Sequence, residues 1–161
     1  MSAPKRVDLV PMTAEEYPLY LEKLIIEYAA ENVTSGRWSA GESVAKSREN
    51  VLGILPDGLA TAGQHLWTAR DPATGARVGL LWLEIRPAAG TTEAFINDIE
   101  VDAPHRGAGY GRAIMTACDD KARELGATRV ALHVHGHNTV ARKLYASLGF
   151  TEKSITMARE L

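Results

Sequence analysis

The sequence is poor in the features that place a protein outside the cell or in a membrane. It has one cysteine in 161 residues, Cys118, so no internal disulfide can form, and this favours a reducing cytoplasm. No apolar run approaches the roughly 18 residues that a membrane span needs. Residues 1–6 lead into a short apolar–polar alternation instead of a hydrophobic signal segment. We therefore expect a cytoplasmic protein without membrane attachment.

An excess of positive charge is also missing. Eighteen lysines and arginines stand against 20 aspartates and glutamates, which gives a net charge of −2. A nucleic-acid-binding protein should present a basic face, so the charge argues against that class of partner. There is no repeat and no low-complexity linker, and the length suits one hydrophobic core. We expect a single domain over residues 1–161.

The periodicity of apolar residues predicts the element order β-α-α-β-β-β-α-β-α-β. Thr13 and Glu16 form a capping-box pattern at the start of the first helix, and the helix after Gly111 joins two strands, which indicates a parallel pair. The expected strands are 6–10, 64–70, 77–86, 93–101, 128–135 and 150–158, with helices between them. The predicted fold class is α/β, with a mixed, mostly antiparallel central sheet and about four helices.

A glycine-rich turn stands between the strand 93–101 and the helix that follows it. It contains Arg106, Gly107, Ala108, Gly109, Tyr110, Gly111 and Arg112. Glycines let the backbone approach a ligand closely, and a helix N-terminus binds phosphate. Arg112-Ala113 after the last glycine excludes a Walker loop, and the spacing and the preceding antiparallel strands exclude a dinucleotide fingerprint. A phosphate-binding turn and a purely structural tight turn remain.

A second segment bears on the choice between these two interpretations of the glycine turn. It reads Asn138-x-x-Ala141-x-x-Leu144-Tyr145-x-x-x-Gly149-Phe150 and is separated from the glycine turn by one predicted helix and one predicted strand. Together the two segments resemble the GNAT superfamily of N-acetyltransferases. The resemblance implies the acyl-CoA N-acyltransferase fold, with acetyl-CoA bound where a pair of parallel strands splays apart. It covers residues 95–150 strongly, and the order of elements fits from Arg6 onward.

The resemblance also implies which residues hold acetyl-CoA. The pyrophosphate would lie on the backbone amides of Gly107, Ala108, Gly109, Tyr110 and Gly111, with Arg106 and Arg112 as charge partners. The backbone of Ile99 and Val101 would bond the acetyl and pantetheine groups as an added strand does. Asn138 would reach the pantetheine arm, although it is equally a plain helix N-cap, and the two roles can coexist.

Tyr145 matches the family tyrosine that protonates the departing thiolate. A phenol keeps its proton at neutral pH and can therefore donate it. The alternative interpretation of Tyr145 is a core aromatic residue on a helix face.

The general base is less narrowly defined. His133 and Glu100 are equally favoured candidates for the general base, and Asp98 is the next candidate. Asp98 and Glu100 share one face of their strand. His133 matches a position that carries a glutamate base in some relatives, and a strand bulge could reverse which acid faces the cleft. His133, His135 and His137 alternate, but no carboxylate or cysteine completes a set of ligands, so we expect no metal.

The predicted function is transfer of the acetyl group of acetyl-CoA to a primary amine, directly in a ternary complex. The two strand carboxylates and an acidic first helix favour a cationic acceptor, either a small molecule or a protein amine. Many members of the superfamily are homodimers, so a homodimer is possible. A non-catalytic acyl-CoA-binding or sensor module is the alternative, and a nucleotide-binding regulator is a third interpretation.

Overall fold

The computed structural model describes residues 3–161, which form two compact units, one ending at Ala131 and one from Leu132 to Leu161. The single domain over 1–161 stays a prediction. The first unit contains β1 (Asp8–Pro11), α1 (Glu16–Thr34), α2 (Ser43–Ile54), η1 (Gly58–Ala60), β2 (Gln64–Arg70), β3 (Arg77–Ala88), β4 (Thr91–Val101), η2 (Ala103–His105) and α3 (Tyr110–Glu124). Strand β5 (Arg129–Leu132) follows, and its last residue, Leu132, is the first residue of the second unit. The second unit also contains α4 (Thr139–Ser147).

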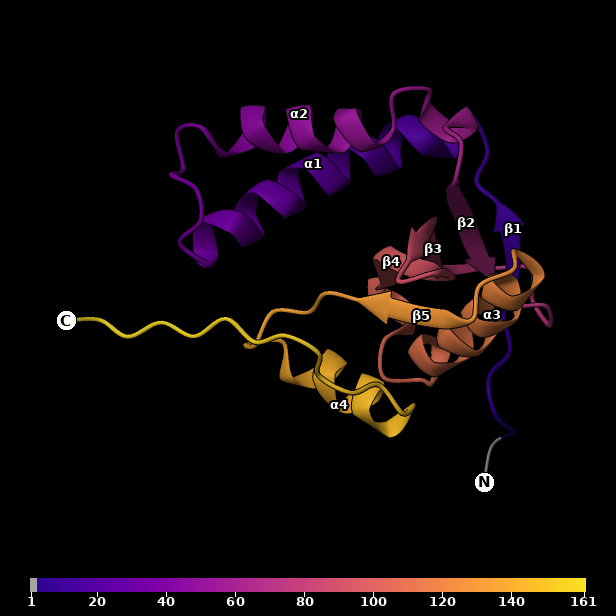
Figure 1. Ribbon diagram of the computed structural model, residues 1–161. Coiled ribbons are helices and arrows are strands. Elements are labelled where there is room, and N and C mark those ends of the chain that lie inside the picture. The colour runs from indigo at the N-terminus through magenta and orange to yellow at the C-terminus, as the bar shows by residue number, and fades with distance from the viewer. Residues whose placement is uncertain (1–2) are drawn as a thin grey trace. The chain divides into compact units, whose positions relative to one another are not determined.

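The five strands form one sheet in the order β1-β2-β3-β4-β5 (Figure 1). Strands β1 to β4 are antiparallel to their neighbours. The start of β5 lies beside the start of β4: the Thr128 amide donates to the Thr92 carbonyl at 2.9 Å, and Arg129 pairs with Glu93. Strands that begin side by side run parallel. The sheet is therefore mixed and mostly antiparallel, as the sequence predicted.

Helices α1 and α2 cover one face of the sheet, and α3 covers the other (Figure 1). Side chains alternate along a strand, so neighbours on β3 separate the two faces. Leu80 belongs to the core under α1 and α2, whereas a Cβ on Gly79 would point at Ile114 of α3. The core under α1 and α2 consists of Met12, Tyr20, Ile25, Val51, Leu55, Leu66, Leu80 and Trp82. The α/β class is confirmed, with four α-helices among residues 3–161.

Local helix signals hold where the sequence placed them. The capping box is formed: the Glu16 amide donates to Thr13 Oγ1 at 3.2 Å, and the Thr13 amide donates to Glu16 Oε2 at 3.0 Å. Helix α4 is capped by Asn138, whose Oδ1 accepts from the Ala141 amide at 3.2 Å. Gly149 follows that helix with a φ of 88°, the left-handed conformation expected of a C-terminal glycine.

Two strand predictions near the C-terminus are wrong. Residues 150–158 form no strand, and β5 ends at Leu132 instead of continuing to His135. A strand is stable only when a neighbour pairs its backbone and a core buries one face. Residues 151–161 are exposed throughout, including Ile155 and Met157, so their alternating pattern has no apolar surface to bury.

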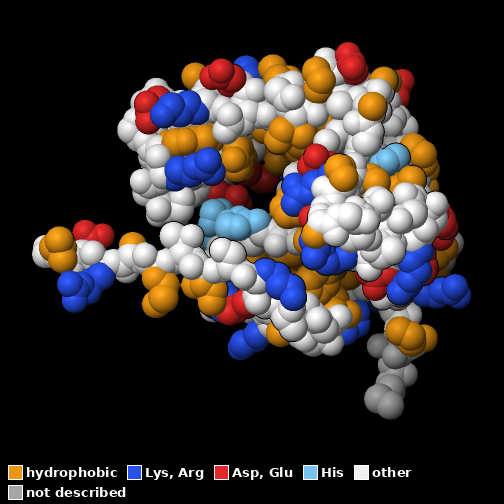
Figure 2. All heavy atoms as spheres, in the orientation of Figure 1, with side chains coloured by type: hydrophobic (Ala, Val, Ile, Leu, Met, Phe, Trp, Pro, Cys, Tyr) orange, Lys and Arg blue, Asp and Glu red, His pale blue; other side chains and the backbone are white. Residues whose placement is uncertain are grey.

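Apolar side chains are also exposed on the helix pair. Figure 2 shows hydrophobic side chains over α1 and α2, and the large exposed ones there are Leu19, Ile26, Val44, Leu52 and Ile54. The homodimer stays a prediction.

Within residues 3–161, no helix is long and apolar enough to cross a membrane.

Candidate active site

The acidic end of β4 faces helix α1. Asp98 lies opposite Trp82 in the β3–β4 register and Glu100 lies opposite Leu80, and both partners belong to the core under α1 and α2. Tyr20 of α1 donates its hydroxyl to Asp98 Oδ2 at 2.9 Å. The expectation that the two acids share a face is therefore confirmed, and that face is the one α1 covers.

A bulge precedes these acids. The register passes from Trp82 opposite Asp98 to Leu83 opposite Ile96, which leaves Asn97 as the extra residue on β4. Both acids lie after the bulge and two positions apart, so their side chains point to the same face of the sheet. The bulge therefore does not reverse which of the two acids faces α1.

The two acids differ in their electrostatic surroundings. Burial raises the pKa of Asp98 to about 6, helped by the nearby charge of Glu100, although the Tyr20 hydrogen bond works in the opposite direction. Glu100 instead forms an ion pair with Lys23 of α1. Burial and charge therefore allow the Asp98 carboxyl, with a pKa of about 6, to exchange a proton near neutral pH.

Ile99 and Val101 alternate with the acids, so their side chains point to the α3 face. They lie opposite Leu81 and Gly79 in the register. The backbones of β3 and β4 approach each other closely here, because a Cβ on Gly79 would overlap the Glu100 carbonyl oxygen. Ile114 Cδ1 would lie 3.0 Å from the same Cβ. The backbone at the end of β4 is thus tightly fixed from the side of β3.

The glycine turn leads directly into α3. Gly107 and Gly109 have φ values of 73° and 94°, in the left-handed region that favours glycine. The first intrahelical bond runs from the Ala113 amide to the Gly109 carbonyl at 3.2 Å, so the amides before Ala113 belong to the helix N-terminus. No atom lies within 4 Å of a Cβ built on Gly107. The turn therefore combines exposed backbone with the positive end of a helix, which suits a phosphate.

The other predicted residues of the turn have distinct settings. Ala108 and Arg112 are exposed and Gly111 is half-buried. Arg106 is exposed, and its Nε donates to the Val101 carbonyl at 3.1 Å, which ties the turn to the end of β4. Tyr110 is buried, and its hydroxyl donates to Asp71 at 2.5 Å. The Tyr110 side chain therefore points into the protein, and only its backbone belongs to the exposed turn.

The remaining predicted residues lie in the unit from Leu132 to Leu161. His133 follows β5 and is exposed, and its ring lies edge-to-face with that of His135 at 5.2 Å between centroids. Asn138 caps α4, so the N-cap role is confirmed. Tyr145 is half-buried on α4, with its ring 5.7 Å from that of Phe150.

Asp98, Glu100 and the glycine turn thus lie in the first unit, on one continuous stretch of chain. The sequence did not identify Tyr20, Lys23 or Asp71 as partners of these residues. Tyr20 is 78 positions from Asp98, and nothing in a single sequence pairs residues over that distance.

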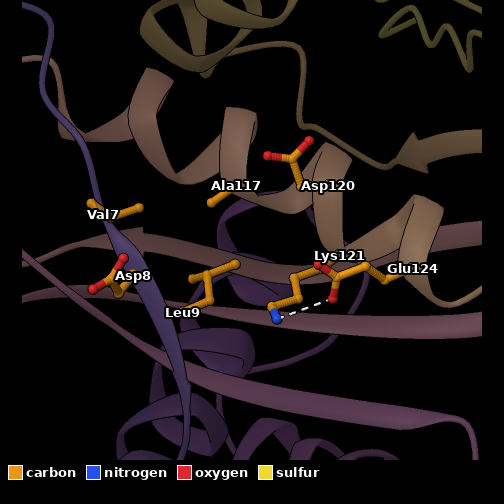
Figure 3. A pocket seen from close by; sticks show the side chains of 7 residues that line it. All are labelled: Val7, Asp8, Leu9, Ala117, Asp120, Lys121 and Glu124. Carbon is orange, nitrogen blue, oxygen red and sulfur yellow. Dashed lines mark hydrogen bonds and ion pairs between the residues drawn. The ribbon is translucent and has the colours of Figure 1, made fainter.

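The hollow drawn in Figure 3 lies elsewhere, between β1 and α3, and has a volume of about 350 Å³. Asp8 and Glu124 line it, and Lys121 in its wall pairs with Glu124 at 3.2 Å. None of the predicted catalytic residues lines this hollow. Within residues 3–161, no group of three or more histidine, cysteine, aspartate or glutamate side chains could hold a metal ion.

Comparison with known proteins identifies relatives across nearly the whole chain. The acetyltransferase (GNAT) family model matches residues 24–150. The chain is 37% identical over 153 residues to the uncharacterized N-acetyltransferase YycN of Bacillus subtilis, with coverage of 95% of this chain and 97% of YycN. The crystal structure of YycN superposes with a TM-score of 0.90, covering 96% of this chain and 98% of the other. Mycothiol acetyltransferase of Beutenbergia cavernae is 38% identical over 90 residues, which is 56% of this chain and 29% of that protein.

Proposed function

Because the chain belongs to the acetyltransferase (GNAT) family, we propose that it transfers the acetyl group of acetyl-CoA to a primary amine, directly in a ternary complex. The observation that carries the proposal is the stretch from Asp98 to Gly111. It begins with a half-buried carboxyl whose pKa is about 6 and ends at a helix N-terminus built from glycines. The first feature can take a proton from an ammonium group, and the second can hold a diphosphate.

The proposed reaction needs two proton transfers. The acceptor arrives as an ammonium ion and must lose a proton before its nitrogen can attack the thioester carbonyl. The new C–N bond forms as the C–S bond breaks, and the thiolate takes a proton. We assign that last proton to Tyr145 as general acid, in keeping with the family resemblance.

Three residues are proposed for the general base. Asp98 is supported by its raised pKa, because its hydrogen bond from the uncharged Tyr20 hydroxyl offsets only part of the rise that burial causes. Glu100 pairs with Lys23, whose ammonium group competes with an incoming ammonium group for the same carboxylate. His133 is exposed, and an imidazole accepts protons near neutral pH. The supporting observations now favour Asp98 over Glu100, the reverse of the order predicted from the sequence.

The residues of the turn fit the diphosphate of acetyl-CoA. The open space beside Gly107 lets an anion approach the backbone, and the amides of Ala108, Gly109, Tyr110 and Gly111 continue into the N-terminus of α3. In the proposal, Arg106 and Arg112 add positive charge, Ile99 and Val101 offer backbone groups to the pantetheine, and Asn138 reaches the same arm.

A cationic amine is the acceptor class we propose. Asp98 and Glu100 lie side by side on one face, and Glu27 and Glu31 of α1 add negative potential at Asp98. An amine that carries further positive charge would be attracted to such a surface. Cys118 is buried and unpaired, in keeping with the proposed cytoplasmic setting.

The direct test measures CoA thiol release with acetyl-CoA and a panel of polyamines, aminoglycosides, lysine derivatives and peptide N-termini. Turnover with at least one cationic amine is expected, with double-reciprocal plots that intersect. Parallel plots or a stable acetyl-enzyme would contradict direct transfer. Tyr145→Phe should lower kcat at least tenfold, whereas Tyr17→Phe, the same change at a half-buried tyrosine of α1 that packs against the core, should not.

The alternatives give different results in the same experiment. A non-catalytic sensor would bind acetyl-CoA and raise the melting temperature, but no amine would release the thiol. A nucleotide-binding regulator would be stabilised more by ATP or NAD than by acetyl-CoA. Either outcome would replace the acetyltransferase assignment.

A further inference from the structure

We propose that Asp71, in the turn between β2 and β3, is a positioning residue that holds Tyr110, and through Tyr110 the glycine turn, in the conformation that receives the diphosphate of acetyl-CoA. The inference rests on the proposed function for the identity of the ligand. The positioning itself follows from contacts within the first unit.

The glycine turn cannot hold its own shape. Glycine has more conformational freedom to lose than any other residue, and three glycines alternate here. Gly107 has no atom within 4 Å of its Cβ position, so packing does not restrain it. Its left-handed φ of 73° is one of several conformations open to an unrestrained glycine. A turn of this composition needs restraint from outside.

Tyr110 supplies the attachment point at the helix end of the turn. Its ring is buried, with 6% of the residue's surface exposed, and its hydroxyl donates to Asp71 Oδ2 at 2.5 Å. The His105 ring meets it edge-to-face at 5.6 Å, and Lys5 Nζ lies 5.1 Å from its centroid. Residues on both sides of Gly107 and Gly109 are thus fixed to one aromatic ring.

Asp71 is itself held rigidly, so it can serve as an anchor. Its second carboxylate oxygen, Oδ1, accepts from the Ala73 amide at 2.8 Å. Its backbone amide donates to the Ala76 carbonyl at 2.9 Å, and its carbonyl accepts from the Gly75 amide at 2.7 Å. The Tyr110 hydrogen bond, followed by the Ala73 amide, lowers the pKa of Asp71, so the carboxylate remains ionised and accepts both bonds at neutral pH. A charged acceptor makes the stronger kind of hydrogen bond.

The other end of the same segment is fixed to the same hairpin. Asp102 follows β4, and its amide donates to the Val78 carbonyl at 2.8 Å. Arg77 Nε donates to Asp102 Oδ2 at 3.1 Å. The chain from Asp102 to Tyr110 is therefore bound at both ends to the β2–β3 hairpin, with the flexible glycines between the two attachments.

This arrangement predicts an effect on affinity for the diphosphate. If the turn is in its receptive conformation only part of the time, the apparent Kd rises by the reciprocal of that fraction. Loss of one charge-assisted hydrogen bond shifts a conformational equilibrium about tenfold. We therefore expect the Kd for acetyl-CoA to rise by up to about tenfold when the Asp71–Tyr110 bond is removed.

The variants Tyr110→Phe, Asp71→Asn and the double variant remove this bond, and Tyr17→Phe is the matched control. The first readout is hydrogen–deuterium exchange of the Ala113 amide, which bonds the Gly109 carbonyl of the turn, without ligand; it should accelerate about tenfold in the three test variants only. The second is the ratio of kcat/KM for acetyl-CoA to that for S-acetylpantetheine, which lacks the diphosphate. That ratio should fall by up to about tenfold, and by no more in the double variant than in Tyr110→Phe alone.

The outcomes separate the two proposals. Unchanged exchange, or equal losses with both thioester donors, would overturn the role of Asp71. Absence of acetyl-CoA binding and turnover in the wild-type protein would overturn the proposed function, while the exchange experiment would still test the positioning. Uniformly faster exchange over α3 and the sheet would show a general loss of stability and would likewise contradict a local role.

Discussion

Asp98→Asn should stabilise the protein at alkaline pH while impairing catalysis. The folded state raises the pKa of Asp98 from 3.8 to about 6, so it binds this proton more tightly than the unfolded chain does. The stabilisation from the proton is fully present below about pH 4 and is lost as the pH rises through about 6. At 1.36 kcal/mol per pH unit, the gap between the two values amounts to about 3 kcal/mol.

Asparagine keeps the size of the side chain and an oxygen that can accept the Tyr20 hydroxyl, but it carries no charge to bury. Relative to wild type, the variant should therefore gain about 3 kcal/mol at pH 8 and only about 0.5 kcal/mol at pH 4. Urea unfolding of both proteins at pH 4, 5, 6 and 8 measures the difference. Asp120→Asn, on the exposed surface of α3, should show no such trend. A difference that stays constant with pH would refute the reasoning.

Two further changes test how the sheet is built. Gly79→Ala should lower the free energy of unfolding by more than about 3 kcal/mol or prevent folding, because its Cβ would overlap the Glu100 carbonyl oxygen of β4. The control is Gly53→Ala on the exposed side of α2, which should raise the free energy of unfolding by about 1 kcal/mol in the same urea titration. Burial would raise the pKa of Glu93, but hydrogen bonds from Arg129 and Arg86 outweigh it and lower the pKa below 4.5. Glu93→Gln should therefore cost about 2 kcal/mol at pH 7, and urea unfolding should show the loss shrinking as the pH falls below 4.5; a loss that does not change with pH would contradict this.

Features governed by neighbouring residues were predictable from the sequence. The Thr13–Glu16 capping box, the Asn138 cap and the Gln64–Arg70 strand all appear where the pattern put them. Each depends on hydrogen bonds or side-chain alternation within a few positions. The glycine turn belongs to the same class, because a left-handed φ at Gly107 and Gly109 is a local requirement.

Features that depend on a distant partner were not predictable. Residues 150–158 alternate as a strand should, yet alternation does not supply a neighbouring strand. The Asp71–Tyr110 bond joins residues 39 positions apart, and the sequence indicated only a turn at one and a ligand-binding loop at the other. The sequence predicted a phosphate site at the turn, but it did not predict the Asp71 carboxylate that holds Tyr110.

The ranking of Asp98 and Glu100 as candidate general bases shows why a sequence pattern can identify candidate residues without ranking them. Alternation places Asp98 and Glu100 on the same face, and it assigns them the same ordinary chemistry. The difference arises from α1, which offers an uncharged hydroxyl from Tyr20 to one acid and a cation from Lys23 to the other. Burial and the neighbouring charge of Glu100 raise the pKa of Asp98, and the Tyr20 hydrogen bond offsets only part of that rise, whereas Lys23 places a positive charge beside Glu100. These partners are determined only when α1 packs on the sheet, so alternation alone cannot distinguish the two acids.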